Sequence, residues 1–252
     1  MVEKSGHEKT LVMVKALPQV GETYGETVCC AGVTTEGKWR RQYPIRFRKL
    51  ENKFTRWQWI EYDWRKPQND PRRESRRVQE DTIKILGKAS PKERTTLLNR
   101  IVVNSYQEAE RQGDSLCLLR PRNTRFKWTK KPEDQLAQEK RAYQAATMQT
   151  SFLDTAEVAP FDPCPFEFKF EFEDDAGKHA PVCQDWETAA MFFNRRKSFT
   201  ETESLRQMSE TFNEEYPEKG MVFSMGTHSR FPIWMLIGII RLDEMAQLDL
   251  GL

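Results

Sequence analysis

The stretch FEFKFEF, at residues 166–172, alternates apolar and charged side chains without a break. Phe166, Phe168, Phe170 and Phe172 fall on one side of an extended chain, and the charged residues between them fall on the other. Successive side chains of a β-strand point to opposite faces of the sheet. The pattern therefore predicts a half-buried strand, in a sheet with one face toward a core.

Further strands are expected on both sides of a central group of helices. Runs rich in β-branched and aromatic residues predict strands at 10–16, 26–33, 38–43, 57–64, 116–119, 221–225 and 233–241. Capping signals predict helices in two pieces between 91 and 112, at 132–148, from 186, and from about 202 to 217. This order indicates an α+β fold with a largely antiparallel sheet that is curled or barrel-like.

The domain organisation follows from one irregular segment. Residues 149–165 contain Pro160, Pro163 and Pro165 and form the best candidate connection. We expect a basic, aromatic-rich α/β half at 1–148 and a β-α-α-β half at 166–252, sharing one core. We find no internal repeat in the sequence.

The chain has five cysteines, an odd number that makes a poor disulfide framework and suits a reducing compartment. The first ten residues lack an apolar segment behind a basic start, so we expect no secretion signal. The longest apolar run, Phe231–Ile240, is far shorter than the roughly 20 residues that span a bilayer. We expect a cytoplasmic protein with no membrane partner.

The strongest compositional anomaly lies between Lys38 and Arg77, where 14 Lys or Arg residues face five acids and eight aromatic residues are interleaved. Cations that follow phosphates and rings that stack on bases are what single-stranded nucleic acid binding needs. The alternative is that the aromatics belong to a core and the cations to solvated strand edges. The candidate nucleic-acid-binding residues are Arg40, Arg41, Arg46, Arg48, Trp57, Trp59, Arg72, Arg73, Arg76 and Arg77.

A second candidate site is the small polar loop between the last two predicted strands, which holds one of only three histidines. Loops that a rigid sheet positions often bind ligands. Asp185 and Glu187 are candidate acids for an enzyme that uses this loop, and an ordinary tight turn is the alternative. The candidate ligand-loop residues are Gly226, Thr227, His228, Ser229 and Arg230.

No cofactor or metal site is predicted. The sequence lacks the glycine-rich phosphate-binding loops, the hydrolase nucleophile motif and the zinc-protease motif. Cys164, His179 and Cys183 match no zinc-ligand spacing, and no fourth ligand is evident.

The chain resembles a family of uncharacterised bacterial proteins that has no established activity. The resemblance rests on ETVCCAGV at 26–33, WRRQYPI at 39–45, WQWI at 57–60, LLRP at 118–121, DWE at 185–187 and MGT at 225–227. It implies no catalytic residue, and it implies a bacterial or phage-related source.

The leading hypothesis is a protein that binds single-stranded DNA or RNA, as an accessory factor in a bacterial or phage system. An enzyme that acts on nucleotides or nucleic acid through the His228 loop is a second hypothesis. The third is a protein-interaction or sensor module without catalysis. The sequence does not decide whether the protein is an enzyme.

Overall fold

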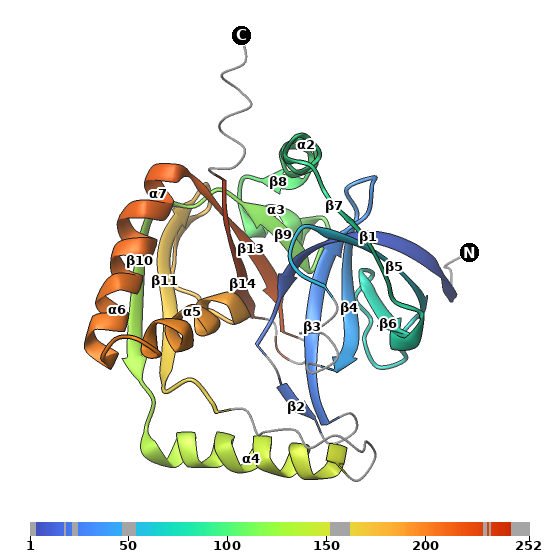
Figure 1. Ribbon diagram of the computed structural model, residues 1–252. Coiled ribbons are helices and arrows are strands. Elements are labelled where there is room, and N and C mark those ends of the chain that lie inside the picture. The colour runs from blue at the N-terminus through green and yellow to red at the C-terminus, as the bar shows by residue number, and fades with distance from the viewer. Residues whose placement is uncertain are drawn as a thin grey trace.

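The structure is a computed structural model that describes residues 4–17, 19–21, 25–46, 54–151, 162–228, 231 and 233–242. It confirms the predicted α+β class with curled sheets. Two such sheets stand side by side, with helices against the outer side of one and a long helix below both (Figure 1). Among the described residues, no helix has the length and apolar character that a membrane crossing requires.

The first sheet closes into a barrel of five strands, here called the first barrel. In barrel order these are β1 (Ser5–Lys15), β3 (Gly25–Val33), β4 (Trp39–Arg46), β6 (Ser75–Val78) and β5 (Gln58–Arg65). The ring closes because β1 pairs with β3 along its second half and with β5 along its first. Only the β4–β6 pair in this ring is parallel. Numbered along the chain, the strand order is 1-2-3-5-4-1, the arrangement of an OB-fold barrel.

The second half of the chain curls in the same order, and we call it the second barrel. Its strands are β9 (Leu116–Leu119), β10 (Arg122–Lys130), β11 (Phe166–Asp174), β12 (Gly177–His179), β13 (Met221–Thr227) and β14 (Trp234–Arg241). The chain bends between β9 and β10, so that β9 pairs with β13 while β10 pairs with β11. Beyond β12, Val182 bridges to β11 and Cys183 bridges in parallel to β14. The second half forms a three-stranded and a four-stranded sheet, which the bend between β9 and β10 and these single bridges join in the strand order of the first barrel, although the sequence carries no repeat.

The remaining elements lie outside the barrel strands. They are β2 (Gln19–Gly21), the 3-10 turn η1 (Glu80–Thr82), β7 (Lys84–Lys88), α2 (Pro91–Ile101), β8 (Val102–Val103), α3 (Tyr106–Arg111), α4 (Glu133–Ser151), α5 (Trp186–Arg196), α6 (Glu201–Glu210), the π-helical turn η2 (Thr211–Glu215) and α7 (Tyr216–Lys219). The predicted caps are confirmed at α2, where Ser90 accepts from the Glu93 amide and Glu93 reaches back to the Ser90 amide. Asp185 likewise caps α5.

Apolar side chains form three clusters rather than one. The interior of the first barrel holds Tyr62 and Trp64, and that of the second holds the predicted phenylalanine row of β11. The third cluster is a layer between the barrels, in which Leu11 and Ile237 belong to opposite sides. Backbones approach closely there, since a Cβ on Gly238 would lie 1.8 Å from Val14 Cγ1.

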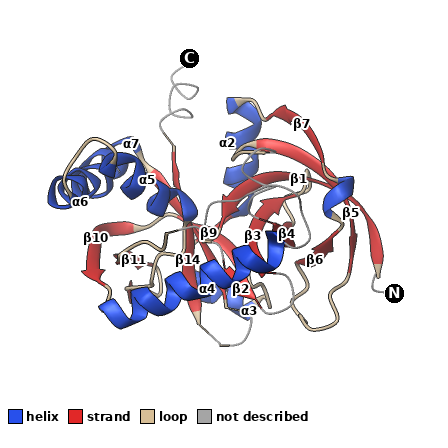
Figure 2. Cartoon of the chain, turned by 60° about the horizontal axis from the view of Figure 1, so that its bottom comes forward, coloured by secondary structure: helices blue, strands red, loops and turns tan. Residues whose placement is uncertain are grey.

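Several elements were not predicted. Strand β10 was missed because one face is polar along its whole length and only Phe126 is buried. The predicted connection at 149–165 falls mostly on residues 152–161, which lie outside the described residues. Before it, α4 runs below the barrels and packs against β2 and β3 (Figure 2).

Candidate nucleic-acid interface

The cations between Lys38 and Arg77 divide into groups that point in different directions. Arg40 and Arg76 both bind the carboxylate of Glu8 on β1. Arg40 Nε donates to Glu8 Oε1 at 2.6 Å and Arg76 Nε donates to Glu8 Oε2 at 3.0 Å. The Arg76 guanidinium also lies 3.9 Å from the ring centroid of Trp64. Both guanidinium groups therefore make intramolecular contacts.

Arg41 occupies the opposite face of β4 and is buried between the barrels, with 6% of its surface exposed. Its Nη2 donates to the Ser115 carbonyl at 3.0 Å, and Glu74 accepts from the Ser115 amide at 2.7 Å. Burial lowers the pKa of the Arg41 guanidinium, with Cys29 and Glu74 opposing the shift. The predicted phosphate ligand Arg41 therefore serves as an inter-barrel contact.

The loop between β5 and β6 also reaches the second barrel. Arg72 holds Asp70 with two nitrogens, at 2.8 and 2.6 Å, and donates its Nη1 to the Thr227 carbonyl at 2.8 Å. Burial raises the pKa of Asp70, but hydrogen bonds from Arg72 and Ser75 outweigh it and leave the pKa lowered. Arg73 pairs with Asp114, which lies just before β9 of the second barrel.

The two predicted tryptophan platforms are partly or fully enclosed. Trp59 is 9% exposed and belongs to the apolar layer between the barrels. Trp57 is half-buried, with the Arg94 guanidinium 5.1 Å from its ring centroid. Of the remaining predicted residues, Arg46 lies in β4 without a described side chain, and Arg48 lies outside the described residues.

An exposed row remains on the outside of the first barrel. Tyr43 of β4 pairs in register with Arg77 of β6, which pairs with Arg65 of β5. All three side chains are exposed, Tyr43 by 38%. Because residues in register on neighbouring strands share a face, the row places one ring and two guanidinium groups side by side.

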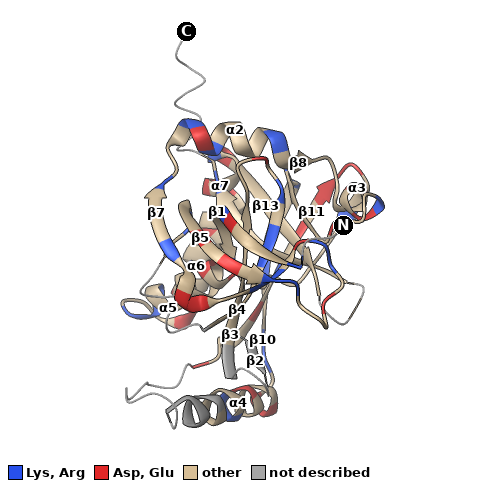
Figure 3. Cartoon of the chain, turned by 90° about the vertical axis from the view of Figure 1, so that its right-hand side faces the viewer, with Lys and Arg blue, Asp and Glu red and all other residues tan. Residues whose placement is uncertain are grey.

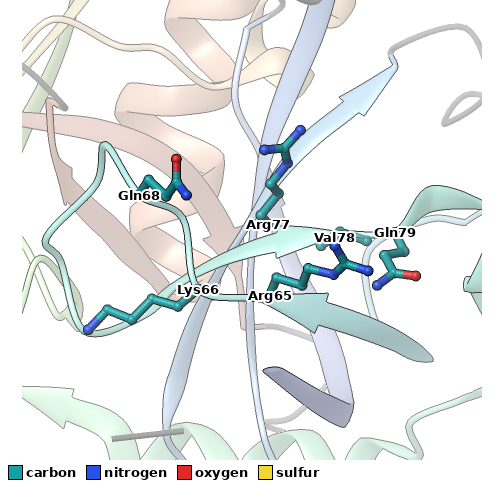
Figure 4. Close-up of a pocket in the computed structure, with 6 residues that line it drawn as sticks. All are labelled: Arg65, Lys66, Gln68, Arg77, Val78 and Gln79. Carbon is teal, nitrogen blue, oxygen red and sulfur yellow. The ribbon is translucent and has the colours of Figure 1, made fainter. Parts of the chain in front are cut away.

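The basic end of this row borders a surface hollow of about 510 Å³. Three basic side chains and no acidic one line it (Figure 4): the lining residues are Arg65, Lys66, Gln68, Arg77, Val78 and Gln79. The side of the molecule that carries β5 has both acidic and basic positions (Figure 3). The hollow is therefore a local concentration of positive charge rather than part of a uniformly basic face.

The polar loop after β13 lies beside the loop after β5, through the Arg72–Thr227 contact. His228 donates its amide to the Ile233 carbonyl at 2.9 Å, and its ring stacks on Phe231 with 5.0 Å between centroids. Ser229 and Arg230 lie outside the described residues. No pattern in the sequence predicts that these two loops lie close together.

The acids proposed for an enzyme lie in a different hollow, of about 560 Å³, against α5 and α6. Asp185 accepts from the Thr188 hydroxyl at 3.0 Å, and Arg56 Nη2 lies 2.9 Å from Glu187 Oε2. Burial raises the pKa of Asp185 to about 7, with Arg56 opposing the shift. His228 is not among the residues that line this hollow, so the geometry does not join it to either acid.

Alternate residues of β4 face opposite sides of the sheet, so the neighbouring residues that the sequence placed in one candidate site lie in different environments. Arg40 and Gln42 face the barrel interior while Arg41 and Tyr43 face outward, and only Tyr43 is exposed. The sequence-based list omitted Tyr43, Arg65 and Lys66, although all three lie in the same basic segment.

Two family models match the chain, and both describe domains of unknown function. One family model, described as "Domain of unknown function (DUF8758)", matches residues 6–104, and another, described as "Domain of unknown function (DUF8757)", matches residues 100–250. No curated protein matches the chain.

Two solved structures are distantly similar to the chain. One described as "Crystal structure of the tetrameric p202 HIN2" is 8% identical over 93% of this chain and 90% of that chain, with a TM-score of 0.33. Another, "Structural mimicry for functional antagonism", is 12% identical over 92% and 89%, with a TM-score of 0.34. Likeness at this level carries no argument about function.

The family matches confirm the resemblance to an uncharacterised family. The second model covers more than half of the 252 residues. The chain belongs to the family described as "Domain of unknown function (DUF8757)".

Proposed function

We propose that this protein binds single-stranded nucleic acid on the outside of its first barrel. The observation that carries the proposal is the exposed row of Tyr43, Arg77 and Arg65, which ends in a hollow lined by cations without an acid. A base can stack on the tyrosine ring while the guanidinium groups hold the adjacent phosphates.

The position of the row in the barrel supports this reading. OB-fold barrels bind oligonucleotides on the face of their second and third strands and on the loops beside it. Tyr43 lies on the third strand, and Lys66 and Gln68 lie in the loop between the fourth and fifth. Because one fold hosts many functions, we infer nucleic acid binding from these side chains and not from the topology.

A single strand fits the row better than a duplex does. The bases of a duplex are stacked on one another, so an aromatic side chain reaches a base face readily only in a single strand. The row offers contacts to phosphates and to base faces, neither of which reads sequence. We therefore expect weak sequence preference.

The experiment is a titration of the intact protein with fluorescently labelled oligothymidine and oligouridine at several salt concentrations. Tyr43→Ala should weaken binding by about 1–3 kcal/mol, the cost of one lost stacking contact, and Tyr43→Phe should retain most of it. Arg65→Ala and Arg77→Ala should each reduce the dependence on salt, since about 0.7 is lost from the logarithmic slope per phosphate contact.

Arg125→Ala is the matched control, because Arg125 is an exposed arginine on β10 of the second barrel. It should leave affinity and salt dependence unchanged. Equal binding by wild type, Tyr43→Ala and the Arg65→Ala, Arg77→Ala double variant, with circular dichroism showing each folded, would refute the proposed surface.

A further inference from the structure

The loops between the fourth and fifth strands of the two barrels lie together. In the first barrel this loop contains Arg72, and in the second it begins after Thr227. Arg72 Nη1 donates to the Thr227 carbonyl at 2.8 Å while Asp70 holds the same guanidinium. One arginine therefore fixes the position of the second loop relative to the first.

The second loop carries an aromatic ring that faces solvent. Phe231 is 59% exposed, and one of its faces rests on the ring of His228 at 5.0 Å between centroids and 28° between planes. The His228 amide donates to the Ile233 carbonyl at 2.9 Å, and the Ile233 amide donates to the Phe231 carbonyl at 2.8 Å. The backbone bonds support a ring that the barrel core does not cover.

The loop base adjoins the face of β4 that carries Tyr43. A Cβ on Gly226 would lie 3.5 Å from Arg41 Nη2, and Tyr43 follows Arg41 by two residues on the same face of β4. The exposed row on the first barrel and the stacked ring pair on the second thus flank one inter-barrel seam, which Arg41 and Arg72 close with hydrogen bonds to Ser115 and Thr227.

We propose that Phe231, supported by His228, is a second base-stacking site for the same strand, so that one strand contacts both barrels. The proposal rests on the proposed function. An exposed ring backed by a second ring presents the flat apolar face on which a base stacks, and stacking tolerates any sequence. Each base stacked in this way contributes enough to change affinity about 5- to 150-fold.

The consequence is a dependence on strand length that the first barrel alone does not produce. OB-fold barrels cover about 4–16 nucleotides each. We expect an oligothymidine of about 8 nucleotides to engage the Tyr43 row alone, and one of about 24, which exceeds the largest site of a single barrel, to reach Phe231 as well. Fluorescence anisotropy of the intact protein with labelled strands of both lengths measures this.

Phe231→Ala should weaken binding of the long strand at least about fivefold and leave binding of the short strand unchanged. Phe231→Tyr should restore the long-strand affinity, because it restores the ring. Ile233→Ala is the matched control from the same loop, since Ile233 is exposed by 53% and has no ring.

The outcomes separate this inference from the proposed function. If Tyr43→Ala weakens both strands and Phe231→Ala weakens neither, the strand contacts only the first barrel and the second stacking site is refuted. If Phe231→Ala and Ile233→Ala weaken the long strand equally, the loss is not one of stacking, and the site is also refuted. If the wild type binds neither strand at low salt, the proposed function itself fails.

Discussion

Asp185 illustrates how a single carboxyl group ties stability to pH in this protein. It is buried at the start of α5, where burial raises its pKa to about 7 against the opposing effect of Arg56. An unfolded aspartate has a pKa of about 3.9. Between these values the folded protein holds a proton that the unfolded chain has released, so this group's contribution to stability is lost as pH rises through the window.

Asp185→Asn removes this titration and keeps a side chain that caps helices. Relative to wild type, the variant should gain about 1–3 kcal/mol of unfolding free energy between about pH 5 and pH 8. Urea denaturation at both pH values measures the difference. A wild-type-to-variant difference that stays constant over this range would show that Asp185 does not titrate there.

At the residue scale, composition predicted that the segment is basic and aromatic, but it did not separate the roles within it. Arg41 and Tyr43 belong to the same segment and the same face of β4, yet one is buried against Ser115 and the other is exposed. The difference depends on where the second barrel sits, which no local pattern in β4 encodes. Trp59 is buried for the same reason, because the second barrel covers it in the apolar layer between the barrels.

At the element scale, the contact of β1 with β14 requires a glycine. A Cβ on Gly238 would lie 1.8 Å from Val14 Cγ1, closer than any real contact, so Gly238→Ala forces the strands apart. Overpacking of this kind costs about 1–3 kcal/mol. Gly238→Ala should destabilise the protein by that amount in chemical denaturation.

A double variant tests the cause. Val14→Ala removes the methyl group that the new Cβ meets, so Val14→Ala with Gly238→Ala should be less destabilised than the sum of the two single variants. Strict additivity would place the cost of Gly238→Ala somewhere other than the β1–β14 contact.

Helices and strands were predictable where a short stretch of sequence carries its own pattern, such as a cap or a regular alternation of apolar and charged residues. The Ser90 capping box and the FEFKFEF alternation each specify an element without help from the rest of the chain, and both are confirmed. Strands β6, β7 and β10 carry weak signals, since β6 has only four residues, β7 has no buried residue and only Phe126 of β10 is buried. The repeated strand order was invisible, because topology depends on pairing partners and not on sequence periodicity.

At the scale of the whole molecule, the apolar layer between the barrels predicts that they unfold together. Leu11, Trp59, Leu116 and Ile237 are each buried in that layer, so separating the barrels exposes side chains from both. We expect a single urea transition in which tryptophan fluorescence and far-ultraviolet circular dichroism coincide. Two resolved transitions would show that each barrel is stable without the other.

The hydrogen bond from Arg72 to Thr227 holds the loops of the two barrels together. Docking of the barrels is therefore coupled to the binding of any ligand at the seam. A molecule that binds only when the loops are in this arrangement favours the docked state by RT ln(1 + [L]/Kd), about 2.7 kcal/mol at a hundredfold excess over Kd. By reciprocity, a change that loosens docking weakens the ligand by the same free energy. Affinity at this surface would therefore report on how firmly the two halves are held together, far from any residue the ligand touches.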